Sequence, residues 1–241
     1  MLRSLLVVLP ATILVALVGF GVMIPVTWLM GDIAPMYAVA RAAVKFLVRL
    51  AGVRLEVSGP DPWLAPQPCI YLANHASNLD PPALFPYLPR IVIMGKAAVF
   101  RWPLLGYALR LAEFVPVERE RPDSRRKALE EAMERVRKGL SLLIFPEGTR
   151  SQDGKLLPFR PGPFTIAIET HAPIVPITLI GTREIMPKGG LAIRPGRARV
   201  VFHLPVPTAG LSAADRETLI ERVRTIIASA LEQPASRDDA G

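Results

Sequence analysis

The sequence of 241 residues has little of what metal centres and disulfide-bonded folds are built from. It contains one cysteine, Cys69, and three histidines. A lone cysteine can form neither a disulfide framework nor a cysteine-rich zinc site, so we expect no metal ion in this protein. Cys69 stands inside an apolar run, and we expect it to be a packed core residue.

Charged residues are absent from positions 4–31. This stretch is longer than the roughly 20 apolar residues that cross a bilayer, and too long for the apolar part of a signal peptide. It predicts a membrane-embedded helix; whether that helix spans the bilayer or enters one leaflet stays open. Four residues, Pro10, Gly19, Gly21 and Pro25, are expected to kink or break it.

The next segment, 36–52, carries Arg41, Lys45 and Arg49 at four-residue spacing, with apolar residues largely on the other side. This pattern predicts a basic amphipathic helix on an anionic membrane surface. The alternative is a helix packed on the main domain with a solvated basic face. More cations follow the uncharged segment than precede it. The positive-inside rule therefore predicts an inner (cytoplasmic) membrane location with the main domain facing the cytoplasm.

The overall composition points to lipid rather than nucleic acid as the partner. Hydrophobic residues make up 51% of the chain, the mean hydropathy is +0.33 and the net charge is +8. A basic surface favours anionic partners, and the excess of apolar residues favours a phospholipid membrane among them. The cations have few aromatic residues between them, unlike a nucleic-acid-binding surface. We therefore expect a membrane partner and no nucleic acid.

Beyond residue 52, apolar strand-like runs alternate with helical patterns. This alternation predicts an α/β fold with a mixed, largely parallel sheet flanked by helices, after the N-terminal membrane-associated helical segment. We expect N-terminal helices over residues 1–52, an α/β domain over 53–232 and a disordered tail over 233–241. The expected strands cover residues 53–57, 68–73, 90–94, 113–117, 140–145, 174–180 and 198–204.

Two helices are the clearest in the pattern. One covers residues 123–138, with Asp123 or Ser124 as its cap and Gly139 as its end. The other begins at Ser212, where Asp215 completes a capping-box-like pair.

The histidine at the end of the second expected strand has a carboxylate five residues after it. A carboxylate that accepts a hydrogen bond from one ring nitrogen leaves the other free to act as a general base. Positions five apart do not share a helical face, so His75 and Asp80 can meet only across a loop or at a helix start. Pro81 favours the first helical position, which makes Asp80 a candidate N-cap. Capping and orienting His75 are compatible roles, and capping alone is the alternative.

No Gly-x-Ser-x-Gly sequence occurs, so the serine of an α/β-hydrolase is missing and a hydrolase is disfavoured. We interpret Ser77 as a turn residue. A base without an enzyme nucleophile would deprotonate a substrate hydroxyl. The pattern therefore indicates direct transfer of a group to an alcohol.

Residues 145–151, Phe-Pro-Glu-Gly-Thr-Arg-Ser, form a second motif. Pro146 and Gly148 fit a type I turn. A turn alone needs neither Glu147 nor Arg150, and an arginine can grip a phosphate with two parallel hydrogen bonds.

Together these residues resemble the glycerolipid acyltransferase family. The resemblance covers most of the chain after residue 50. The family's motifs are matched, in order, by Asn74 with His75 and Asp80, by residues 96–119, by residues 145–151, and by residues 159–164 and 174–177.

The resemblance implies that His75 is the general base and Asp80 its orienting partner. The free sn-2 hydroxyl of lysophosphatidic acid would then attack an acyl thioester, giving phosphatidic acid. The donor would be acyl-CoA or acyl-carrier protein as co-substrate, and no cofactor is expected. The acceptor would be bound by four residues of the third motif, with two cations of the second adding positive charge: Glu147, Gly148, Thr149 and Arg150, with Lys96 and Arg119.

Two alternatives stay open. The same chemistry could serve another acceptor, namely another lysophospholipid, a lyso-ornithine lipid or glycerol 3-phosphate. A non-catalytic lipid-binding module is the other alternative.

Three positions depart from the family pattern. Glu113 stands where glycine is usual, Glu118 where aspartate is common, and Ala98 replaces a frequent glutamate. A cluster of cations follows, which we interpret as a solvated face or as a docking site for an acidic carrier protein or the phosphates of a coenzyme: Arg119, Arg121, Arg125, Arg126 and Lys127.

Overall fold

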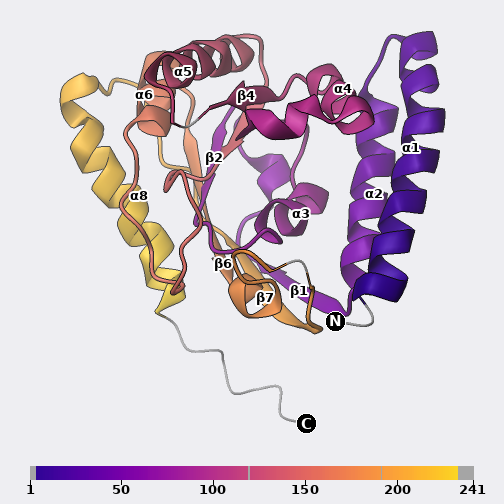
Figure 1. The fold of residues 1–241 in the computed structure, drawn as a ribbon. Helices are drawn as coiled ribbons and strands as arrows, with labels where there is room; N and C mark the ends of the chain where they lie inside the picture. The colour runs from indigo at the N-terminus through magenta and orange to yellow at the C-terminus, as the bar shows by residue number, and fades with distance from the viewer. Residues whose placement is uncertain (1–3, 119, 191, 233–241) are drawn as a thin grey trace.

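The computed structural model describes residues 4–118, 120–190 and 192–232 (Figure 1). Arg119 and the expected tail, 233–241, lie outside the described residues. Seven strands form one sheet in the order β1-β7-β6-β2-β5-β3-β4. The strands are β1 (Val53–Ser58), β2 (Ile70–Ala73), β3 (Ile91–Lys96), β4 (Val115–Val117), β5 (Ser141–Ile144), β6 (Ile174–Ile180) and β7 (Gly196–Phe202).

Most of the sheet is parallel. Strands β6, β2, β5, β3 and β4 run the same way, whereas β7 pairs antiparallel with β6 and β1 pairs parallel with β7. All seven expected strands are present, within a few residues of their expected bounds. The predicted mixed, largely parallel sheet flanked by helices is confirmed.

Helices cover both faces of the sheet because successive strand residues point to opposite sides. Ile70 and Leu72 of β2 belong to the core beneath the helices at residues 122–137, 162–170 and 216–231, whereas Tyr71 and Ala73 belong to the core beneath those at 34–50 and 80–84. Cys69 is fully buried, as expected. The helices are α1 (Leu9–Met30), α2 (Ala34–Leu50), α3 (Asp80–Leu84), α4 (Pro103–Leu111), α5 (Pro122–Arg137), α6 (Gly162–Thr170), α7 (Thr182–Ile185) and α8 (Arg216–Leu231).

Helix α1 follows a turn of π-helix, Ser4–Val8, and stands beside α2 at one side of the molecule (Figure 1). It continues unbroken through Pro25, so the expected break is absent. Pro10 lies in the first turn, where a missing amide hydrogen costs no intrahelical bond. The stretch Leu6–Met30 has a mean hydropathy of 2.6 and little burial. Within the described residues, it is the one helix long and apolar enough to cross a bilayer, which suggests membrane association.

The cations of α2 turn toward the main domain. The Arg41 guanidinium lies 4.9 Å from the ring centroid of Trp63, and the Lys45 ammonium lies 5.6 Å from that of Tyr87. Aromatic faces attract such cations. On the other side of the helix, the Phe46 side chain is 55% exposed. The helix packs on the main domain, as the alternative expectation holds, but its basic face is only partly solvated: Lys45 and Arg49 are exposed, whereas Arg41 is half-buried. The membrane-surface location stays a prediction.

Of the two helix caps predicted from the sequence, one is wrong and one is confirmed. Helix α5 begins at Pro122 with Arg121 as N-cap, so the expected cap at Asp123 or Ser124 was wrong. The Ser124 hydroxyl instead accepts from the amide of Glu118, at 3.0 Å. Ser212 does form the expected capping box, at the short 3₁₀ helix that leads into α8.

Glu113 shows why glycine is usual at its position. Its backbone has φ +63°, the left-handed region that favours glycine. The Glu113 carboxylate pairs with Arg90 at 3.1 Å and with Arg135 at 3.2 Å. These two ion pairs help to offset the cost of about 1–2 kcal/mol for a left-handed residue with a side chain.

Candidate active site

His75 is separated from the end of β2 by Asn74 alone, and Asp80 is the first residue of α3. The Nδ1 atom of His75 lies 2.7 Å from Oδ2 of Asp80. An ionised carboxylate only accepts hydrogen bonds, so the contact requires the proton on Nδ1 and leaves Nε2 as a proton acceptor. The expected contact across a loop into a helix start is confirmed.

Asp80 holds the loop together from inside. Its buried Oδ2 atom also accepts from the amides of Ala76, at 2.8 Å, and Ser77, at 2.7 Å. Both amides lie upstream of α3, so Asp80 is not the N-cap that the sequence predicts; Leu79 occupies that position. The carboxylate thus fixes the same loop whose histidine it orients.

Ser77 completes this loop as the expected turn residue. Its hydroxyl donates to the carbonyl of Met186, at 2.6 Å, and accepts from the amide of Leu79, at 2.9 Å. Asn74, on the other side of His75, exchanges two hydrogen bonds with the backbone of Leu179 in β6. The backbone around His75 is therefore tied down on both sides.

Glu147 braces His75 from the second motif. Its Oε1 accepts from the His75 amide, at 2.7 Å, and its Oε2 accepts from the Leu157 amide, at 3.1 Å. The side chain is 3% exposed, and this burial raises the pKa of Glu147 to about 7, although the two backbone amides pull it down. With both oxygens engaged, Glu147 is placed to position His75 rather than to touch a substrate.

The second motif forms the expected turn. The Gly148 amide donates to the carbonyl of Phe145, at 3.0 Å. The motif is joined to the first at two further points: the Ser151 amide donates to the His75 carbonyl, at 2.8 Å, and the Arg150 side chain donates to Asn78. Arg150 therefore stands beside the loop that carries His75, in a half-buried position.

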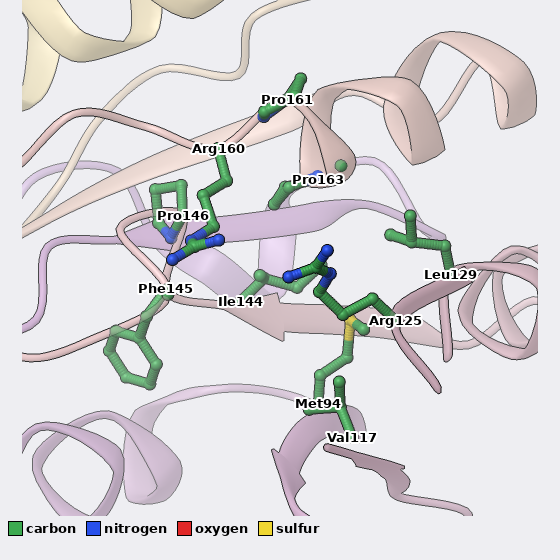
Figure 2. Close-up of a pocket in the computed structure, with 12 residues that line it drawn as sticks. Met94, Val117, Arg125, Leu129, Ile144, Phe145, Pro146, Arg160, Pro161 and Pro163 are labelled. Atoms are coloured by element: carbon green, nitrogen blue, oxygen red, sulfur yellow. The ribbon is translucent and has the colours of Figure 1, made fainter. Parts of the chain in front are cut away.

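A pocket of about 370 Å³ is connected to His75 through one of its lining residues, Phe145, and Figure 2 shows that lining. Phe145 connects the two: it lines the pocket, and its ring stacks on the imidazole with centroids 4.1 Å apart. The His75 side chain is 11% exposed. The pocket is lined by Met94, Val117, Arg125, Leu129, Ile144, Phe145, Pro146, Gly148, Arg160, Pro161, Gly162 and Pro163.

The other expected site residues lie at different places. Thr149 is exposed on the turn. Lys96 is exposed at the end of β3 and lines a separate surface pocket with Arg101 and Arg121. Val117 lines both pockets, so the surface that carries Lys96 adjoins the pocket beside Phe145. Lys96 itself is not among the residues that line the pocket beside Phe145.

Sequence reasoning assigned no role to Arg160, although the fold brings it to the pocket. Its place in the segment 159–164, which matches the family, was the available signal. A cation in a matched segment does not reveal which surface it faces. The fold had to supply that information.

Comparisons with known proteins show the family of this chain. Residues 54–180 match the family described as Acyltransferase. The chloroplastic 1-acyl-sn-glycerol-3-phosphate acyltransferase of Brassica napus is 44% identical over 140 residues, covering 58% of this chain and 41% of that protein. The 1-acyl-sn-glycerol-3-phosphate acyltransferase alpha of Bos taurus is 32% identical over 203 residues, covering 83% of this chain and 71% of that protein.

A solved structure resembles the whole fold. The 1-acyl-sn-glycerophosphate (LPA) acyltransferase PlsC from Thermotoga maritima superposes with a TM-score of 0.80 and 26% identity, covering 95% of each chain. The chain spans about two fifths of the length of two plant relatives that it matches. This protein belongs to the acyltransferase family.

Proposed function

We propose that this protein is an O-acyltransferase that moves a fatty acyl group from an acyl thioester to the sn-2 hydroxyl of lysophosphatidic acid, giving phosphatidic acid. The observation that carries the proposal is the contact between His75 and Asp80 at the end of β2, beside an apolar pocket. The names of the relatives in Brassica napus, Bos taurus and Thermotoga maritima support this acceptor.

The reaction follows from that geometry. Nε2 of His75 takes the proton from the acceptor hydroxyl, and the hydroxyl oxygen attacks the thioester carbonyl carbon. The tetrahedral intermediate then collapses, the carbon–sulfur bond breaks, and the thiolate takes the proton back from His75. Asp80 stabilises the imidazolium that exists between these steps. No enzyme nucleophile is needed, because the acceptor itself attacks.

The acceptor phosphate is assigned to Arg150, whose hydrogen bond to Asn78 holds it beside the catalytic loop. Gly148 and Thr149 give the turn that presents Arg150, and Glu147 positions His75. Lys96 adds positive charge on the neighbouring surface. Arg119, expected to do the same, lies outside the described residues. In lysophosphatidic acid the phosphate is close to the reacting hydroxyl, so an anion contact beside the loop that carries the base fits this acceptor.

Membrane attachment is assigned to α1, with the main domain on the cytoplasmic side of an inner membrane. The exposed apolar side chains of α1 and the cations that follow it support this placement. Protease treatment of oppositely oriented membrane vesicles tests it. Cleavage of the α/β domain only where the cytoplasmic face is outside is expected, and cleavage only from the other face would contradict the orientation.

The deciding test is direct transfer by the detergent-solubilised protein. Acyl-CoA or acyl-carrier protein is offered with lysophosphatidic acid, glycerol 3-phosphate, a lyso-ornithine lipid or other lysophospholipids. We expect phosphatidic acid to form fastest. Faster transfer to another acceptor would keep the chemistry and change the product, and lipid binding without any transfer would indicate a binding module.

The matched variants are His75→Ala and His171→Asn. His171 is exposed at the end of α6 with φ +54°, a conformation that asparagine tolerates. We expect His75→Ala to lower turnover by about 10²–10⁴, the contribution of a positioned base, with unchanged circular dichroism. His171→Asn should retain turnover. Normal turnover in His75→Ala would remove His75 from the mechanism.

A further inference from the structure

The pocket beside Phe145 combines an apolar floor with a cationic mouth. Met94 of β3, Val117 of β4 and Ile144 of β5 come from neighbouring strands, and Leu129 covers them from α5 (Figure 2). Its volume of about 370 Å³ falls within the range of pockets that bind small molecules. The floor suits methylene and methyl groups rather than a fully hydrated ligand.

Two guanidinium groups are directed into this pocket. Arg125 reaches in from α5, and Arg160 reaches in from the loop before α6, so that both point toward the same space (Figure 2). The lining residues include no aspartate or glutamate. Two like charges directed at one space favour an anion between them, and guanidinium groups suit phosphate in particular. The ligand therefore has a phosphate attached to a partly apolar body.

Gly148 keeps Arg160 in this position. A Cβ atom at Gly148 would lie 2.5 Å from Nε and 2.8 Å from Cδ of Arg160, which is closer than such atoms approach. The left-handed backbone at Gly148, φ +70°, disfavours a side chain as well. The glycine of the second motif thus leaves the space through which the Arg160 side chain reaches the pocket.

The pocket cations are separate from the one assigned to the acceptor. Arg150 contacts Asn78 on the catalytic loop and is not among the residues that line the pocket. Arg125 enters beyond Phe145, the residue that stacks on His75 (Figure 2). The acceptor phosphate must lie close to the reacting hydroxyl. In a phosphopantetheine thioester, by contrast, the whole pantetheine arm separates the phosphate from the reacting carbon.

We propose that Arg125 and Arg160 bind the phosphate of the donor's phosphopantetheine arm, while the floor of the pocket contacts the arm itself. The inference rests on the proposed function, since it concerns the second substrate of that reaction. Acyl-CoA and acyl-carrier protein share this arm, so one site serves both.

Binding measurements test the assignment without turnover. The probe is a thioether analogue of acyl-phosphopantetheine, compared with the same analogue lacking the phosphate, by calorimetry on the full chain in detergent. We expect Arg160→Gln and Arg125→Gln each to lower the affinity for the phosphorylated analogue about tenfold. The affinity for the analogue without the phosphate should stay unchanged. Arg126→Gln is the matched control, because Arg126 lies on the same helix, is 85% exposed and pairs with Glu130. Equal losses for both analogues would overturn the assignment.

Kinetics separate the two substrates. The donor KM should rise in Arg160→Gln while the KM for lysophosphatidic acid stays constant, with acyl-CoA and acyl-carrier protein affected alike. A rise confined to the acceptor KM would place the acceptor phosphate here and overturn the inference. A rise of the donor KM for acyl-CoA but not for acyl-carrier protein would also overturn the inference, because the two arginines would then bind the nucleotide phosphates of coenzyme A. Arg160-dependent binding of the analogue without any transfer would reject the proposed function and keep this inference.

Discussion

The loop from His75 to Asp80 and the cations around it are built in opposite ways. The loop is tied by hydrogen bonds to buried groups: Asp80 at its end is fully buried, and Glu147 of the second motif, which accepts from the His75 amide, is 3% exposed. Arg125 and Arg160, by contrast, lie exposed at the pocket mouth, and Arg150 is half-buried. A general base must be held within a narrow geometry, whereas a phosphate contact works through a charge on a longer, adjustable side chain. Changes in the loop should therefore affect turnover, and changes in the cations should affect substrate affinity.

The largest effect after loss of His75 itself is expected for Asp80→Asn. The oxygen of asparagine can still accept the three hydrogen bonds that Oδ2 accepts, but the side chain is neutral and no longer stabilises an imidazolium. Its NH₂ group would stand in the place of Oδ1, a buried atom without a hydrogen-bond partner among the described residues. We expect turnover to fall by about 10², and unfolding free energy by about 1–3 kcal/mol, the cost of unsatisfied buried groups. Steady-state kinetics and thermal melts measure both quantities.

Asp61→Asn is the control for this change. Asp61 is exposed and accepts a single backbone bond, from the Trp63 amide at 2.9 Å. Asparagine caps equally well, so both turnover and stability should be retained. An Asp80→Asn variant as active as Asp61→Asn would show that the buried carboxylate does not control the base.

A smaller effect, on affinity alone, is expected for Arg150→Ala. Loss of a charge-assisted contact to the acceptor phosphate should raise the acceptor KM about tenfold and leave the donor KM unchanged. Arg183→Ala is the matched control, because Arg183 donates to the carbonyl of Gln152 in the same loop. A fall in kcat without a change in KM would contradict the division between a loop that controls turnover and cations that control affinity. Arg150 would then act together with the loop that holds His75.

An effect of another kind is expected in the pH dependence of stability, through Glu147→Gln. Burial raises the pKa of Glu147 from 4.5 to about 7. Between these values the folded protein binds more protons at Glu147 than the unfolded chain, so this group makes stability fall as pH rises. The wild type should therefore lose stability relative to Glu147→Gln between pH 4.5 and 7. Parallel melting curves across this range would contradict the raised pKa.

The loop was largely predictable because its information is local. The contact between His75 and Asp80 follows from their five-residue spacing and from Pro81. The detail that failed was the N-cap: the Asp80 carboxylate turns back to the amides of Ala76 and Ser77 instead of forward into α3. Either direction satisfies an aspartate at a helix start, and only the surrounding loop selects one.

The cations were less predictable because their neighbours are far away in the chain. Arg41 and Lys45 form a basic helical face in the sequence, and the fold places them over aromatic rings of the main domain. Glu147 resembles a substrate ligand in its motif, yet its carboxylate accepts from the amide of a residue 72 positions away. Periodicity shows which residues share a face, but not what that face meets.

The sequence by itself determined the elements of this protein and the chemistry available to it. Apolar runs set the strands, an uncharged run set α1, and two motifs supplied a base, its carboxylate and a turn with an arginine. The tertiary structure decided which of these groups meet. The strand order brings β3, β4 and β5 together, so that Arg125 and Arg160 point into one pocket beside Phe145. The physical reason is that hydrophobic periodicity acts over a few residues, whereas the position of a charge depends on packing between distant segments.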